Sequence, residues 1–171
     1  MQAKQAKLSL KNRALRFLSL REHSRLELKR KLMRYAEEGD NVDELLDALE
    51  KSRFLSCERF SESLIRRRSE SYGNHRILAE LQTHGLDSEL LAHSKVELAE
   101  SEVARACAVW QKKFGRTTEL PFGDSADCSA TEPDLREQRA RQIRYLAQRG
   151  FSGKAIRAAM SGCDDVPDDL D

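Results

Sequence analysis

Apolar residues recur along most of the chain at every third or fourth position, which is the spacing of one face of an α-helix. The stretch 72–91 shows this most clearly, through Ile77, Leu78 and Leu81. Gly85 follows where a helix would end in the left-handed conformation that glycine adopts most readily. Asp87 is then suited to cap the next helix. The stretch is predicted to form a helix, a glycine stop and a second helix.

The pattern of this stretch returns 65 residues later. The matched pairs are Arg76 and Arg141, Leu81 and Leu146, Gly85 and Gly150, Leu86 and Phe151, and Asp87 and Ser152. An echo at a fixed offset is the sign of an internal repeat, in which each unit buries its apolar face partly against its neighbour. A repeat is therefore favoured over the alternative, a single irregular helical bundle.

The same spacing predicts nine helices in three groups of three. In chain order they cover about 8–20, 24–35, 42–51, 56–68, 74–84, 88–99, 102–115, 134–149 and 152–160. Ser24 and Glu27 have the spacing of a capping box at the start of the second helix. Residues expected to face inward include Tyr35, Ile143 and Ala147.

This grouping predicts three tandem three-helix repeats, at 8–53, 54–100 and 101–162. The third contains an irregular loop at 116–134, and an acidic, disordered tail follows at 163–171. Leu, Glu, Arg and Ala dominate the sequence, and β-branched residues are sparse, so no strand is expected. The predicted fold is all-α, with the repeats forming an elongated, curved, right-handed or solenoid-like array.

The charge of the chain is unevenly distributed. Charged residues make up 35% of the sequence, against about 25% in an average globular domain, yet the net charge is only +1. Residues 1–35 carry a net charge of +9 and residues 135–158 a net charge of +6, whereas residues 36–50 hold seven acids and no base. Basic blocks separated by acidic ones suit contact with a polyanion or an acidic protein surface, although any single block is ordinary solvated surface by default.

No pattern in the sequence indicates catalysis or a cofactor. The glycines are isolated, so no phosphate-binding loop is present, and no Ser or Cys stands in the context of a nucleophile. The four cysteines form no CxxC pair and the histidines have no zinc-ligand spacing, so no metal site is expected. No apolar run is long enough to span a membrane. We expect a cytoplasmic protein that is not an enzyme and has no membrane contact.

Basic side chains are the remaining candidates for function. They cluster on several predicted helices: Arg21, Lys29, Arg30, Arg34, Arg66, Arg67, Arg68, Arg76, Arg141, Arg144 and Arg149. If equivalent positions of successive repeats carry them, they form a positive stripe suited to a phosphate backbone or a nucleoprotein filament. Tyr72 and Trp110 could stack on bases, but a place in the core is favoured for both.

Three segments of the chain resemble the signature segments of the bacterial RecX regulatory proteins. They are RALRFLSLREHSRLELKRKL (13–32), ERFSESLIRRRSESYGNHRILAELQTHGL (58–86) and RQIRYLAQRGFS (141–152). They occur in the family's order, and the resemblance spans roughly residues 8–160.

The resemblance implies tandem three-helix repeats and no catalytic residues. Proteins of this family bind the RecA recombinase filament along its groove and restrain its ATPase, strand-exchange and coprotease activities, and some also contact DNA. It therefore implies a negative modulator of RecA in DNA repair and SOS regulation, expected to be a monomer. Two alternatives remain open: a helical repeat module that binds single- or double-stranded DNA without RecA, and an unrelated helical scaffold.

Overall fold

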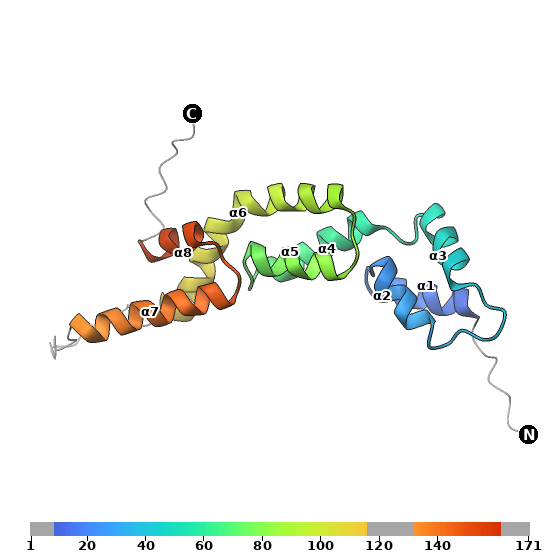
Figure 1. The fold of residues 1–171 in the computed structure, drawn as a ribbon, viewed down its shortest axis with the longest axis horizontal. Coiled ribbons are helices and arrows are strands. Elements are labelled where there is room, and N and C mark those ends of the chain that lie inside the picture. The colour runs from blue at the N-terminus through green and yellow to red at the C-terminus, as the bar shows by residue number, and fades with distance from the viewer. Residues whose placement is uncertain (1–8, 116–131, 162–171) are drawn as a thin grey trace, which may run out of the picture. The chain divides into compact units, whose positions relative to one another are not determined.

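The computed structural model describes residues 9–115 and 132–161, and all the regular secondary structure within these ranges is helical (Figure 1). The helices are α1 (Leu10–Leu20), α2 (Arg25–Leu32), α3 (Val42–Lys51), α4 (Cys57–Ser69), α5 (Asn74–Thr83), α6 (Ser88–Phe114), α7 (Glu132–Gln148) and α8 (Gly153–Met160). The all-α prediction is confirmed.

Polar side chains begin the helices as the sequence predicts. The Ser24 hydroxyl accepts a hydrogen bond of 3.1 Å from the Glu27 N–H at the start of α2. The Ser152 hydroxyl accepts one of 3.3 Å from the Ala155 N–H at the start of α8, and the Asp87 carboxylate accepts one from the Leu90 N–H at 2.7 Å. Each bond satisfies a backbone donor that has no partner within its own helix.

The two echoed turns share one backbone conformation. Gly85 has a φ of +70° and Gly150 a φ of +83°, in the region that side chains with a Cβ avoid. Leu81 and Leu146, which precede these glycines by the same interval, are both fully buried. The sequence echo therefore corresponds to a repeated local structure.

The described chain divides into two compact units. Unit 1 comprises residues up to 64 together with 80–91, and unit 2 comprises 65–79 together with the residues from 92 onward. The core of unit 1 lies among α1, α2 and α3 and contains Ala14, Leu28, Leu32, Val42, Leu46, Leu49 and Leu55. The core of unit 2 lies among α6, α7 and α8 and contains Ala106, Cys107, Val109, Leu146, Phe151, Ala155, Ile156 and Ala159.

One predicted helix boundary is wrong. The sequence suggested that one helix ends near Ala99 and another begins near Glu102, but α6 continues without interruption from Ser88 to Phe114. No glycine or proline occurs between these residues, so nothing stops the helix. The described ranges consequently hold one helix fewer than predicted.

Three side chains expected to face inward are exposed. Tyr35 and Ile143 are exposed to 45% and 41%, and Ala147 also faces outward. The face of α7 that packs against the core instead runs through Tyr145 and Leu146. The predicted loop lies largely outside the described residues, except that α7 already begins at Glu132, and the predicted acidic tail lies outside them entirely.

Candidate protein and nucleic-acid interface

Two of the predicted contact residues in unit 1 are neutralised by carboxylates. Arg21 forms a two-pronged ion pair with Glu27 and also donates to the Glu22 carbonyl at 3.0 Å. Lys29 donates to both oxygens of Asp43, at 2.7 and 2.8 Å. Arg21 and Lys29 are thus each held in an ion pair within unit 1.

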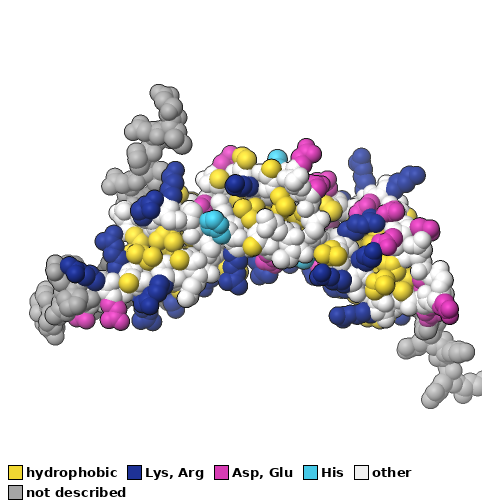
Figure 2. Space-filling view, in the orientation of Figure 1, with side chains coloured by type: hydrophobic (Ala, Val, Ile, Leu, Met, Phe, Trp, Pro, Cys, Tyr) yellow, Lys and Arg dark blue, Asp and Glu magenta, His cyan; other side chains and the backbone are white. Residues whose placement is uncertain are grey.

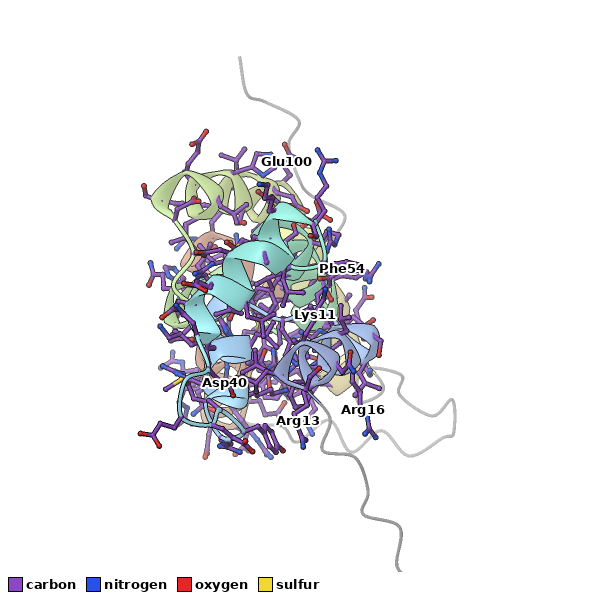
Figure 3. All side chains as sticks on the ribbon, turned by 90° about the vertical axis from the view of Figure 1, so that its right-hand side faces the viewer. Lys11, Arg13, Arg16, Asp40, Phe54 and Glu100 are labelled. Atoms are coloured by element: carbon purple, nitrogen blue, oxygen red, sulfur yellow. The ribbon has the colours of Figure 1, made fainter. Side chains whose placement is uncertain are left out.

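Arg30 and Arg34 are different, because both are exposed and neither has an ion pair or hydrogen bond within the described part of the chain. Arg16 on α1 shares this exposure and points away from α2 and α3 (Figure 3). Basic and acidic side chains are mixed over α1 to α3 in Figure 2. In unit 1, Arg16, Arg30 and Arg34 therefore carry exposed positive charge that no carboxylate of the described residues neutralises.

Glu27 belongs to a buried polar network that fixes the start of α2. His23 is 1% exposed; its Nδ1–H donates to the Arg21 carbonyl at 2.8 Å, and Lys31 donates to its Nε2 at 2.8 Å. Burial lowers the pKa of His23, although the nearby Glu27 carboxylate opposes that shift. Burial of the Glu27 carboxylate tends to raise its pKa. The hydrogen bond from Arg21 outweighs this effect, so the pKa of Glu27 is lowered. Burial of the His23 ring thus favours its neutral form.

Five predicted contact residues in unit 2 are exposed on the surface of helices. Arg66, Arg67 and Arg68 lie at the end of α4, and Arg141 and Arg144 lie on α7. Arg144 donates to a carbonyl of its own helix, that of Ala140, at 3.4 Å. Figure 2 shows basic side chains around an apolar patch over α7 and α8. Arg66, Arg141 and Arg144 form no ion pair with a carboxylate of the described residues.

The remaining two candidates converge on one aromatic ring. The guanidinium of Arg76 lies 4.4 Å from the centroid of the Tyr72 ring, and that of Arg149 lies 5.8 Å from it. Arg149 also lies 4.5 Å from the centroid of Tyr145, and Arg68 lies 5.7 Å from that of Tyr72. We call Arg68, Tyr72, Arg76, Tyr145 and Arg149 the Arg–Tyr cluster.

The hydrogen bonds of Arg149 and Arg76 go to neutral acceptors. Arg149 donates to the Ser71 carbonyl at 2.9 Å, and Arg76 approaches the Gln148 carbonyl at 3.5 Å. Neither guanidinium forms an ion pair with a carboxylate of the described residues. Both side chains are thus held in place while their charges stay uncompensated, unlike those of Arg21 and Lys29.

A close backbone contact holds the cluster together. The Gly73 N–H donates to the Arg149 carbonyl at 2.9 Å, and the His75 N–H donates to the Gly150 carbonyl at 3.1 Å. A Cβ added at Gly73 would overlap backbone atoms of Gly150 and Phe151. The turn between α4 and α5 therefore reaches the turn between α7 and α8 only because residue 73 has no side chain.

Two charged residues of α6 form hydrogen bonds with the same two turns. The buried Glu102 carboxylate accepts hydrogen bonds from the N–H groups of Asn74 and Ser152, at 3.2 and 3.1 Å, and from the Ser152 hydroxyl at 2.6 Å. Arg105 donates to the Tyr72 carbonyl at 2.8 Å and to the Asn74 side chain. Burial lowers the pKa of Arg105, and the Glu102 charge opposes this shift. The starts of α5 and α8 are thus joined through one helix.

Sequence reasoning identified the arginines of the cluster but missed its aromatic centre. Tyr72 was expected in the core, whereas it is half-buried and surrounded by guanidinium groups. Glu102 and Arg105 were missed as well, because acidic and basic residues on a predicted helix are usually solvated. The only feature of the sequence that pointed to this role of Tyr72 was its position shortly after Arg66, Arg67 and Arg68.

Two further kinds of feature, a metal site and a membrane-spanning helix, were sought among the described residues. They contain no group of three or more His, Cys, Asp or Glu side chains placed to hold a metal ion. Within the same ranges, no helix is both long enough and apolar enough to cross a membrane.

The sequence matches family models and related proteins, and these matches show its family. Residues 11–49 match the model of the first three-helix domain of RecX, and residues 129–160 match that of the third. The regulatory protein RecX of Herminiimonas arsenicoxydans is 52% identical over 153 residues, which cover 90% of this chain and 91% of the relative. This chain belongs to the RecX family. The regulatory protein RecX of Herbaspirillum seropedicae is 51% identical and covers 89% of each chain.

Solved structures of RecX proteins support the helical fold. A crystal structure of RecX from Lactobacillus salivarius has a TM-score of 0.67 at 19% identity and covers 89% of this chain and 92% of its own. A second crystal structure, of a regulatory protein RecX, has a TM-score of 0.69 at 17% identity and covers 90% of this chain and 72% of its own. The all-helical fold is therefore one that RecX proteins adopt in crystals.

Proposed function

We propose that this RecX-family protein is a non-enzymatic regulator that binds the RecA–DNA filament in its groove and restrains ATP hydrolysis, strand exchange and coprotease activity. The observation that carries the proposal is the 52% identity to a protein named regulatory protein RecX over nine-tenths of both chains. The action on RecA is what the family resemblance implies.

The surface chemistry of the described residues agrees with this role. Arg30, Arg34, Arg66 and Arg141 are exposed and have no carboxylate partner within the described ranges. Such side chains bind phosphates and carboxylates through charge-assisted hydrogen bonds. We propose that they, with Arg67 and Arg144, contact the filament, and that Arg21 and Lys29 act mainly in folding.

We also propose that the functional units are the three-helix repeats predicted from the sequence, with α6 shared between the second and the third. The first and third family domains match within the first and third predicted repeats. A repeat array would present its basic side chains over an extended surface rather than at one pocket.

Association with the filament tests the proposal. The protein should bind RecA filaments assembled on single-stranded DNA more tightly than it binds the same DNA alone. Reversing the charge of Arg66, Arg141 and Arg144 together should weaken filament binding by about tenfold or more. The matched control replaces the same three residues by lysine and should stay much closer to the unaltered protein. Binding to filaments no tighter than to DNA would contradict the proposal.

A further inference from the structure

An open hollow in unit 2 gathers positive side chains that no described carboxylate neutralises. It has a volume of about 260 Å³, and Lys112, Lys113 and Arg149 line it together with Tyr145. Both lysines are exposed and form no ion pair within the described ranges. Glu70 also lines the hollow, but it forms no ion pair with a described residue either. Three like charges around one hollow repel one another, so an anion placed among them is stabilising.

The hollow has an apolar wall as well as a charged one. Val109 is 7% exposed and belongs to the core of unit 2. The half-buried Tyr145 packs edge-to-face on Phe114, with 5.3 Å between the ring centroids. Carboxylates suit the charged wall through charge-assisted hydrogen bonds, and aliphatic side chains suit the apolar wall. The hollow is therefore suited to an acidic peptide that also carries aliphatic residues.

The chain itself contains a peptide of this kind shortly after α8. Residues 163–171 read CDDVPDDLD. With five aspartates and no lysine or arginine, the side chains of this segment carry a charge of −5. Val166 and Leu170 stand among the aspartates. The segment thus has both the charge and the aliphatic side chains that the two walls of the hollow suit.

The segment is long enough to reach the hollow. Met160, the last residue of α8, packs against the same core as Val109 and Tyr145. An extended chain spans about 3.3 Å per residue, so residues 162–171 cover up to about 33 Å, whereas the whole of α8 is only about 12 Å long. A short tether also gives an effective concentration of roughly a millimolar. Individually weak ion pairs are then sufficient to keep the segment in place.

We propose that the acidic segment 163–171 docks in this hollow. Its aspartates pair with Lys112, Lys113 and Arg149, and its aliphatic side chains lie on Val109 and Tyr145. The protein thus covers part of its own basic surface, and any other ligand of that surface must displace the segment. This inference goes beyond the proposed function, because the contact forms in the protein alone; only its effect on filament binding rests on that function.

Cross-linking with a carbodiimide tests the contact, because this reagent joins a carboxylate directly to an amine that lies beside it. Peptide mapping should find the segment joined to Lys112 or Lys113 about three times as often as to Lys154, or more. Lys154 is a stringent control, since it is exposed at the start of α8 and lies nearer to the segment along the chain. The excess should disappear at about 1 M salt, where charges are screened beyond roughly 3 Å.

The rate at which lysines are acetylated gives a second measure. Replacing the five aspartates by asparagine should speed acetylation of Lys112 and Lys113 about threefold or more relative to Lys154, because the docked segment shields their amines. Replacing the same aspartates by glutamate keeps the charge, so the rates should stay within about twofold of those of the unaltered protein. Both measurements use the protein alone, so their failure is separate from a failure of the proposed action on RecA.

Three results would overturn the proposal. Cross-links to Lys154 that equal or exceed those to Lys112 and Lys113 would mean that the tether alone governs the contact. In a mixture of isotope-labelled and unlabelled protein, cross-links that join the two forms would place the segment on a second copy of the chain. Unchanged acetylation of Lys112 and Lys113 in the asparagine variant would mean that the aspartates do not cover the hollow.

Discussion

Replacing Gly73 by alanine should separate the two turns that carry the Arg–Tyr cluster. The new Cβ would overlap the Gly150 carbonyl and the Phe151 nitrogen, which are backbone atoms and cannot rotate away. The turns must therefore move apart, which breaks the hydrogen bonds from Gly73 to Arg149 and from His75 to Gly150. The resulting structure cannot keep Arg149 in its present place beside Tyr72.

The magnitude of this effect follows from the contacts that are lost. Two backbone hydrogen bonds contribute about 1 kcal/mol each. Forcing extra volume into a close-packed contact costs a further 1–3 kcal/mol or so. Gly73→Ala should therefore lower the free energy of unfolding by about 3–5 kcal/mol, a large share of the roughly 5–15 kcal/mol typical of a domain.

Urea unfolding measures the loss, with Trp110 as an intrinsic probe. It is the single tryptophan of the sequence, and its indole N–H donates to Gln142 of α7 at 3.1 Å, so its fluorescence reports the α6–α7 contact. The matched control is Gly153→Ala in the first turn of α8, where the new Cβ would meet only the Arg157 guanidinium, at 3.5 Å. This control should be neutral or stabilising by up to about 1 kcal/mol. If the two variants unfolded within about 1 kcal/mol of each other, the reasoning would be refuted.

Other predictions concern the buried polar groups and one strained residue. Glu102→Ala should destabilise the protein by about 3 kcal/mol in urea unfolding, because three donors lose their acceptor, whereas Glu102→Gln should lose only about 1 kcal/mol. Burial lowers the pKa of both His23 and His84, so the unfolded chain binds more protons than the folded one below about pH 6.5. Stability should then fall on acidification through that range, by up to about 1.4 kcal/mol per pH unit for each histidine, and a flat profile between pH 7.5 and 5.5 would contradict this. Arg53 has a φ of +56°, so Arg53→Gly should raise the urea midpoint, with a gain of about 0.5–1 kcal/mol; a lower midpoint would count against strain there.

Local rules predicted much of the fold. Ser24, Ser152 and Asp87 cap helices, and Gly85 and Gly150 have the left-handed conformation, because each property depends on residues within one turn of the chain. The repeat echo was visible for the same reason. The continuity of α6 was missed, although its lack of glycine and proline indicated it.

Long-range contacts could not be predicted. The close approach of Gly73 to Gly150 joins residues far apart in the chain, and no local pattern encodes it. The orientation of α7 depends on the same packing, so Ile143 was wrongly placed inward. The sequence also identified eleven basic candidates without separating Arg21, which is paired with Glu27, from Arg76, which contacts the Gln148 carbonyl and the Tyr72 ring.

The proposed regulation of RecA is tested most directly by the rate of DNA-stimulated ATP hydrolysis by RecA, measured as this protein is added in increasing ratio. We predict that the rate falls as the ratio rises. Inhibition far below one molecule per RecA protomer would indicate that filament ends are capped, and a stoichiometric requirement would indicate that the groove is coated. An unchanged rate at one molecule per protomer would contradict the proposed function.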